Sequence, residues 1–284
     1  MREEENKVAN SDDVPVVTIK SHSLLESIDF KELIHYRDLF FFLVWKNIKV
    51  LYAQTILGFL WAILNPLIQI VIFTIIFGKV AKLDTGGIPY ALFSTVAIVP
   101  WAYMSGAMLA SSQSLVTGQS MLGKVYFPRL IFPVTPVLSK LVDFGISILL
   151  VAVVLIYYGV APTANYIFLP LFILIMMAVP TGFGLWLSSL AIRYRDVKFV
   201  MPFFLSMLIY SAPILYSANK IPEAYRFIYS LNPIVSVIEG YRSCLLGTPM
   251  PWGYILPGTV MAILLVSSGA IYFRRMERVI VDVI

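Results

Sequence analysis

Residues 144–192 read FGISILLVAVVLIYYGVAPTANYIFLPLFILIMMAVPTGFGLWLSSLAI, a run of 49 residues without a charged side chain. A helix needs about 20 apolar residues to cross a hydrocarbon core about 30 Å thick, so the run is too long for one crossing. It divides at Gly159–Asn165 (GVAPTAN), a composition typical of a tight turn. We therefore expect two antiparallel spans, near Phe144–Tyr158 and Tyr166–Leu190, the first starting slightly earlier if Asp143 is tolerated.

Four more apolar stretches of similar length lie on either side of this run. They are Leu57–Phe77, Tyr90–Ala110, Phe199–Ser217 and Ile255–Phe273. The whole chain is 59% hydrophobic and only 13% charged, whereas about 25% of the residues in a soluble protein are charged. The expected fold class is an all-α integral membrane protein, with a domain of six transmembrane helices over residues 53–284.

The basic residues alternate across these spans. Sixteen of the 21 Lys and Arg residues fall in residues 1–50, 124–140, 193–198 and 274–278. Short loops rich in Lys and Arg stay in the cytoplasm, so the alternation predicts a multi-pass protein with both termini cytoplasmic. The N-terminus lacks a basic region followed by a short apolar core, and no cleavable signal peptide is expected.

The segment before the first span has two parts. Residues 1–29 are polar and are expected to form a cytoplasmic tail. In residues 30–52, Lys31, Asp38 and Lys46 share one narrow helical face with Lys49. This pattern predicts an amphipathic helix in the membrane interface. An extension of the first span is the alternative interpretation.

Between the fifth and sixth spans, residues 219–252 contain two short apolar pieces separated by Asn232-Pro233. Neither piece is long enough to cross, and a charge at the bilayer centre costs about 2.5–3.5 kcal/mol on insertion scales. We expect short external helices that re-enter the membrane, because irregular backbone is tolerated there only inside protein or beside a wet cavity. A surface cap without a gating role is the alternative. The candidate periplasmic gate residues are Glu223, Arg226, Asn232, Pro233, Glu239 and Arg242.

Enzyme and cofactor sites find little support. Residues 118–125 have P-loop spacing up to Lys124, but Val125 stands where Ser or Thr should bind Mg²⁺. The span centres carry no acid or base, and Cys244 is the only cysteine. The pI near 9.2 is better explained by anionic lipid headgroups than by nucleic acid. We therefore expect no metal, no cofactor and no nucleic-acid partner, and a transport subunit rather than an enzyme.

The loop Arg193–Lys198 (RYRDVK) joins two full spans through very few residues. Such a loop holds both helix ends rigidly and can pass a push from a cytoplasmic partner into both. Positive-inside anchoring alone would explain the basic residues of this loop but not Asp196. The amphipathic helix and the 124–140 loop offer further cytoplasmic docking surface.

In its order of motifs, the chain resembles the permease subunits of ABC transporters that export O-antigen or teichoic acid. The resemblance covers residues 30–275. The motifs are 57–66 (LGFLWAILNP), 193–197 (RYRDV), 213–216 (PILY), 231–233 (LNP) and 240–242 (GYR).

This resemblance implies a homodimer in the bacterial inner membrane, with a channel between the two sets of spans. It also implies a separate ATP-binding subunit that docks on the cytoplasmic surfaces, and an undecaprenyl-linked polysaccharide as substrate. The residues expected to couple to the ATPase are Arg37, Lys46, Lys124, Arg193, Tyr194, Arg195 and Asp196.

Two alternatives stay open. One is a small-molecule, drug or lipid exporter of the same superfamily. The other is an integral-membrane enzyme acting on lipid-linked sugars, for which Asp143, Glu223 and Glu239 are the candidate groups. The sequence does not specify the polymer or the width of the channel.

Overall fold

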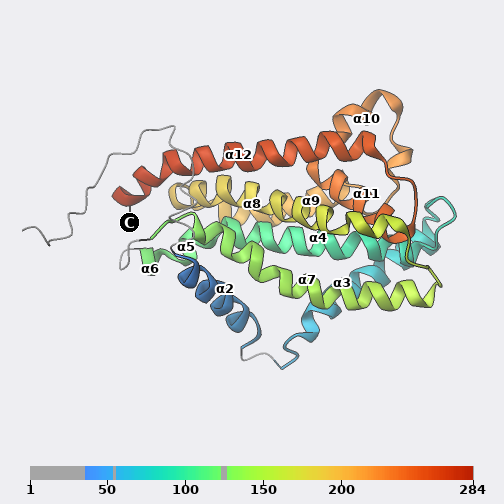
Figure 1. Cartoon of the computed structure of the whole chain (residues 1–284), viewed down its shortest axis with the longest axis horizontal. Coiled ribbons are helices and arrows are strands. Elements are labelled where there is room, and N and C mark those ends of the chain that lie inside the picture. Colours follow the sequence, from blue (N-terminus) through green and yellow to red (C-terminus); the bar gives the residue numbers. More distant parts are fainter. Residues whose placement is uncertain (1–35, 54–55, 123–126, 284) are drawn as a thin grey trace, which may run out of the picture.

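In the computed structural model of the chain, long helices lie side by side along one axis, and α2 (Arg37–Tyr52) lies oblique to them (Figure 1). The structure describes residues 36–53, 56–122 and 127–283, and every regular element in these ranges is helical. The other helices are α3 (Leu60–Phe73), η2 (Thr74–Val80), α4 (Tyr90–Ser112), α5 (Ser114–Thr117), α6 (Gln119–Leu122), α7 (Ile131–Tyr157), η3 (Ala164–Phe168), α8 (Leu169–Arg193), α9 (Val197–Ser211), η4 (Ala218–Lys220), α10 (Glu223–Ser230), α11 (Pro233–Leu246) and α12 (Trp252–Val283).

Five helical stretches are long and apolar enough to cross a membrane, which confirms the expected all-α membrane class. They are Leu60–Val80, Tyr90–Ser112, Ile131–Tyr157, Ala164–Arg193 and Trp252–Glu277. The fifth expected span, Phe199–Ser217, is represented by α9, which has only 15 residues. This helix stops early because Ala212, which precedes Pro213, takes an extended conformation with φ −114° and ψ 157°.

The third span also differs from its expected range. Helix α7 begins at Ile131 and therefore carries Lys140 and Asp143 within the helix, and their side chains form an ion pair of 2.7 Å. The span was expected to begin near Phe144, or slightly earlier if Asp143 is tolerated, so a helix that contains both charged residues was not expected. The turn expected at residues 159–165 is present, with Gly159 at φ +67°.

Helix α4 forms the centre of the bundle and packs against α3, α7, α8 and α11. Buried residues make up 78% of its apolar stretch, against 11% for the stretch that contains α3. The most exposed spans are therefore at the edge of the bundle, where α3 and α9 present large apolar side chains to the surroundings.

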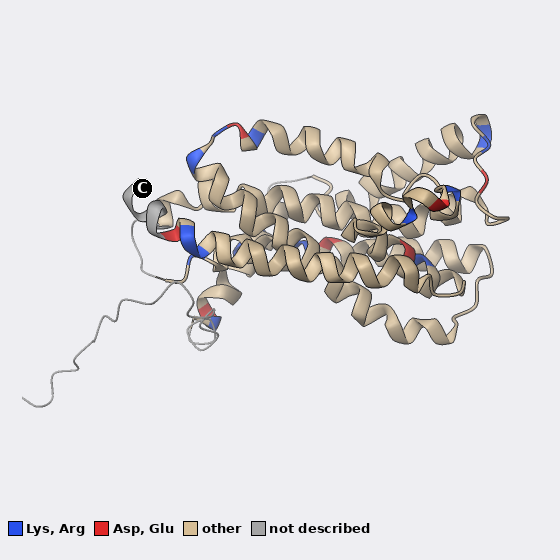
Figure 2. Cartoon of the chain, turned by 90° about the horizontal axis from the view of Figure 1, so that it is seen from above, with Lys and Arg blue, Asp and Glu red and all other residues tan. Residues whose placement is uncertain are grey.

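The loops divide between two ends of the bundle, and Figure 2 shows most charged segments at these ends with largely uncharged helices between them. At one end, Arg129 donates to the backbone oxygen of Glu277 in α12 (2.9 Å). We call this the basic end, defined by Arg129, the Arg193–Lys198 loop and the last turns of α12. At the other end, which we call the α10 end, Lys220 pairs with Asp84 (2.7 Å).

The two short helices between α9 and α12 form where the apolar pieces predicted them. The Asn232 side chain caps α11 by accepting a hydrogen bond from the Ile234 amide (3.0 Å), and Pro233 occupies its first turn. Gly247 ends α11 in the left-handed region (φ +68°). Helix α11 is buried among α4, α8 and α12, whereas α10 is largely exposed.

Candidate functional site

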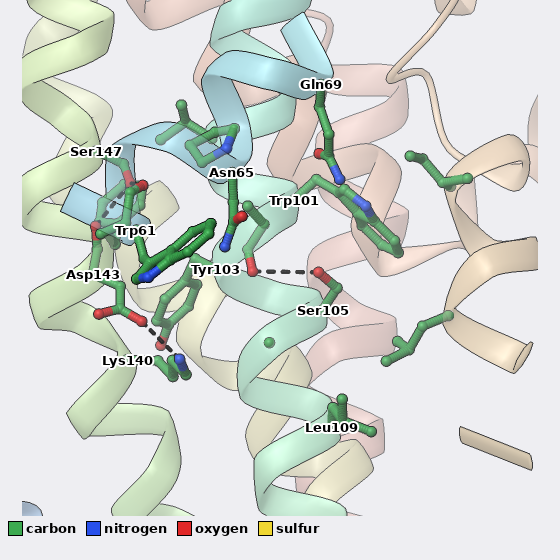
Figure 3. Close-up of a pocket in the computed structure, with 18 of the residues that line it drawn as sticks. Trp61, Asn65, Gln69, Trp101, Tyr103, Ser105, Leu109, Lys140, Asp143 and Ser147 are labelled. Atoms are coloured by element: carbon green, nitrogen blue, oxygen red, sulfur yellow. Dashed lines mark hydrogen bonds and ion pairs between the residues drawn. The ribbon is translucent and has the colours of Figure 1, made fainter. Parts of the chain in front are cut away.

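A lateral groove of about 790 Å³ lies between α3, α4, α7 and α9. Residues four apart on one helix share a face, and two such rows line the groove. Helix α3 contributes Trp61, Asn65 and Gln69, and α4 contributes Trp101, Ser105 and Leu109 (Figure 3). Figure 3 shows Trp61 and Asn65 pointing into the space between these helices. The wall therefore combines indole rings with amide and hydroxyl groups.

The opposite side of the groove is formed by α7 and α9. Ser147 and the Lys140–Asp143 pair come from α7, and Tyr210 comes from α9. The positive and negative charges of the pair compensate each other, so the groove carries little net charge. A groove with aromatic faces, hydrogen-bonding groups and little net charge suits a polar, weakly charged solute better than an ion.

At the α10 end, Arg242 brings three segments together. Its guanidinium binds Glu239 (2.5 Å) and the backbone oxygen of Pro213 (2.7 Å), and it lies 3.8 Å from the centre of the Phe93 ring. The side chain is 6% exposed, so this ion pair is inside the protein. Arg242 thus ties α11 to α4 and to the segment that follows α9.

A tyrosine cluster lies beside this arginine. The rings of Tyr216 and Tyr254 both pack against Tyr229, whose hydroxyl donates to that of Tyr216 (3.3 Å). Burial, followed by this hydrogen bond, raises the pKa of Tyr229 well above its usual value. Tyr229 therefore remains neutral at physiological pH.

The predicted gate residues fall into two groups. Asn232, Pro233, Glu239 and Arg242 belong to α11 or its cap, and Asn232 also reaches the backbone oxygen of Ser211 (3.3 Å). Glu223 and Arg226 instead form an exposed pair on α10 (3.3 Å). The motifs 213–216, 231–233 and 240–242, far apart in sequence, thus lie in one place.

The predicted coupling residues also occupy separate surfaces. Arg193, Tyr194, Arg195 and Asp196 are all exposed at the basic end, and the Arg193 guanidinium lies 5.5 Å from the centre of the Tyr194 ring. Arg37 and Lys46 are exposed on α2. Lys46 borders a smaller cavity of about 300 Å³ between α2 and the bundle. Lys124 lies outside the described residues.

The carboxylates proposed for an enzyme do not converge. Asp143 pairs with Lys140, Glu223 with Arg226 and Glu239 with Arg242, each within its own helix. In the part of the chain that the structure describes, no group of three His, Cys, Asp or Glu residues could hold a metal. Each of these three carboxylates is bound to a cation of its own helix, so none of them is free to act as a general acid or base.

The sequence analysis named none of the lining residues Trp61, Asn65, Gln69 and Trp101 as site residues. The four-residue spacing of Trp61, Asn65 and Gln69 was the available signal, because it places polar or aromatic groups on one face of an apolar helix. The sequence of α9 shows no comparable pattern that would predict its place beside the groove.

Comparisons with known proteins identify related chains. A family model described as "ABC-2 type transporter" matches residues 38–246. The O-antigen export system permease protein RfbA of Myxococcus xanthus is 27% identical over 251 residues, covering 87% of this chain and 96% of that relative. Its counterpart in Klebsiella pneumoniae is 26% identical over 241 residues, covering 84% and 92%. The polysialic acid transport protein KpsM of Escherichia coli is 24% identical over 218 residues, covering 75% and 81%.

Proposed function

The chain belongs to the ABC-2 type transporter family, and on that premise we propose that it is the channel-forming permease subunit of an ATP-driven polysaccharide exporter. The substrate is a lipid-linked polysaccharide of the O-antigen type, moved from cytoplasm to periplasm across the inner membrane. Its most similar relatives named above are O-antigen export permeases, and the match extends over most of both chains.

The groove between α3, α4, α7 and α9 is the observation that carries this proposal. Sugar rings present apolar C–H faces to aromatic side chains, and their hydroxyls bind amides and hydroxyls at the rim. Trp61 and Trp101 supply the first kind of contact, and Asn65 and Gln69 supply the second. Such contacts are individually weak, so a polymer can slide along the wall.

We infer that a second copy of the chain completes the channel. Helices α3 and α9 border the groove, and their apolar side chains, among them Leu60, Ile68, Phe203 and Met207, are exposed in the single chain. A homodimer joined along these helices would bring two grooves together. In this arrangement α9 acts as the fifth of six spans, and both termini are cytoplasmic.

The basic end is proposed as the docking surface for a separate ATP-binding subunit. The exposed loop from Arg193 to Asp196 joins α8 directly to α9, one of the groove helices. A push on this loop therefore reaches the groove without an intervening flexible segment. Arg37 and Lys46, which are exposed on α2, are proposed as a second contact surface for the same subunit, and Lys124 is proposed as a further coupling residue.

We propose that α10 and α11 close the periplasmic exit. Arg242 and Glu239 provide the fixed part of this gate, because their ion pair is enclosed by the protein and Arg242 also donates to the backbone oxygen of Pro213. Glu223 and Arg226 lie on the exposed α10, the part that is freer to move. Helix α11, with Asn232 and Pro233 at its start, re-enters the membrane from the periplasmic side.

The test is polysaccharide export in cells that express the chain with its ATP-binding subunit. Trp61→Ala removes an aromatic face worth about 0.5–1.5 kcal/mol, so we expect surface polysaccharide to fall several-fold. Trp252→Ala is the matched control, because this tryptophan lies outside the groove against Phe168. Export that is equal in the two variants, or ATP hydrolysis by the purified chain alone, would contradict the proposal.

A further inference from the structure

One edge of α7 carries polar groups at four-residue spacing: Ser139, Asp143 and Ser147. Each of them contacts a different part of the chain that precedes α4. Ser139 and Asp143 reach α2, and Ser147 reaches α3. A single helical face therefore touches both the amphipathic helix and a wall of the groove.

The contacts to α2 lie at its middle and its end. The Ser139 hydroxyl lies 3.3 Å from the backbone oxygen of Val44 and 2.8 Å from that of Thr135, and shares its proton between them. The Tyr52 hydroxyl donates to one carboxylate oxygen of Asp143, and Lys140 binds the other at 2.7 Å. The end of α2 is thus fastened to a charge that already has a counterion.

The contact to α3 depends on the proline of the 57–66 motif. Pro66 has no amide proton, so the backbone oxygen of Ala62 lacks its partner one turn later. The Ser147 hydroxyl lies 2.8 Å from this oxygen and equally far from the backbone oxygen of Asp143. An unmatched oxygen at membrane depth costs several kcal/mol, so α3 is held against α7 at this point.

Helix α2 does not continue into α3 as one helix. Helix α2 ends at Tyr52 and α3 begins at Leu60, with a turn at Gly58 (φ +47°). A displacement of α2 would be absorbed by this turn unless a third element held both helices. Helix α7 is that element.

We propose that the α7 edge formed by Ser139, Asp143 and Ser147 is the joint through which movement of α2 is passed to α3, changing the width of the groove. Asp143 and Ser147 are positioning residues in this scheme, since they act through Tyr52 and the Ala62 backbone. The inference rests on the proposed function, in which an ATP-binding subunit presses on α2.

The first measurement is polysaccharide exported per ATP hydrolysed by the complete transporter. Tyr52→Phe removes one hydroxyl without stranding a charge, because Lys140 still pairs with Asp143. Ser147→Ala frees the Ala62 oxygen, and Ser147→Thr restores a hydroxyl. We expect continued ATP hydrolysis and about tenfold less export per ATP in the Tyr52→Phe, Ser147→Ala double variant, within the usual range of site-to-site coupling. When Ser147→Thr takes the place of Ser147→Ala in this double variant, most of the lost export per ATP should be recovered.

Ser189→Ala is the matched control. Ser189 is buried in α8 away from the groove, and its hydroxyl donates within α8, to the backbone oxygen of Leu185 (3.1 Å). It should leave export per ATP unchanged. A double variant with the export ratio of the control would overturn the joint.

The second measurement needs neither substrate nor ATPase. Spin labels are attached to cysteines that replace the exposed Trp45 on α2 and Val71 on α3, in a Cys244→Ser background. We expect a narrow distance distribution in the unmodified joint, a broader one in the double variant, and no change in Ser189→Ala. An unchanged distribution would overturn the joint. A wild-type transporter that hydrolyses ATP without exporting polysaccharide would instead overturn the proposed function, while the label distances still decide the joint.

Discussion

Arg242 is the residue that joins α11, α4 and the segment after α9 at the α10 end. It is buried with Glu239, and its remaining contacts are the backbone oxygen of Pro213 and the ring of Phe93. Removing one member of a buried ion pair strands the other, which is far more damaging than losing an exposed pair. The chain offers both kinds of pair on neighbouring helices.

We therefore predict that Arg242→Ala lowers the free energy of unfolding by about 3–5 kcal/mol, seen as a lower Tm of the protein in detergent. Arg226→Ala, which breaks the exposed pair with Glu223, should change it by less than about 0.5 kcal/mol. Equal shifts in Tm would show that Arg242 is not buried in an ion pair.

Two helical glycines differ in what surrounds them. A Cβ atom at Gly240 would lie 1.9 Å from the Phe172 ring, whereas one at Gly145 has no atom within 4 Å. Gly240→Ala should destabilise the protein by about 1–3 kcal/mol through overpacking. Gly145→Ala should stabilise it by up to about 1 kcal/mol, because alanine favours helix. Thermal unfolding of the two variants checks both signs, and a loss in Gly145→Ala would contradict the second.

At the residue scale, sequence reasoning works best where partners are near in the chain. Residues three apart on a helix are neighbours, so a pair such as Lys140–Asp143 is open to prediction. Sequence reasoning could not match Ser147 to the Ala62 oxygen, because that contact joins residues 85 positions apart. Pro66 indicates that the Ala62 backbone oxygen lacks its helical hydrogen bond, but it does not indicate which side chain donates to that oxygen.

At the scale of elements, the loop after η2 and the short helix η4 meet through one ion pair. The Lys220 ammonium lies 2.7 Å from Asp84, and the Gly86 amide donates to the same carboxylate (2.9 Å). The hydrogen bond from Lys220 is the main reason that the pKa of Asp84 lies below its ordinary value of 3.8. The contact is therefore complete above that value and is lost as pH falls through the lowered pKa.

This predicts that an NMR titration of the Asp84 carboxyl has its midpoint below the ordinary value, and that Lys220→Ala raises the midpoint. The side chains are exposed, so overall stability at neutral pH should hardly change. Identical midpoints in the two proteins would show that the two segments do not meet in solution.

Helices were predicted more reliably than their ends. The apolar pieces at 224–231 and 234–246 became α10 and α11 because Asn232 and Pro233 punctuate them strongly. The end of α9 was placed six residues too late, although Pro213 signalled it. The burial of α11 inside the bundle depends on α4, α8 and α12, and local composition does not reveal it.

At the scale of the whole molecule, the two ends of the bundle should face opposite sides of the membrane. Tyr194 is exposed at the basic end and Tyr225 at the α10 end. In a Cys244→Ser background, we predict that a membrane-impermeant thiol reagent labels Tyr225→Cys in spheroplasts, but labels Tyr194→Cys only after permeabilisation. The unmodified chain is the control, because its only cysteine is buried. The reverse labelling pattern would invert the proposed topology.

The charge alternation predicted the grouping of loops at two ends, because the positions of the Lys and Arg residues can be read directly from the sequence. The groove could not be predicted from the sequence, because it forms only where four helices pack at defined distances. Its polar face on α3 was visible in the spacing of Trp61, Asn65 and Gln69, but not the partners opposite.

The 15-residue length of α9 has a consequence for the surrounding lipid. At 1.5 Å per residue it spans about 22 Å, short of a hydrocarbon core about 30 Å thick. Lipid against this helix must thin to meet it, at a fraction of a kcal/mol for each ångström of mismatch. A second copy of the chain covering α9 would remove that strain. Pairing of the two copies should therefore tighten in thicker bilayers and loosen in thinner ones.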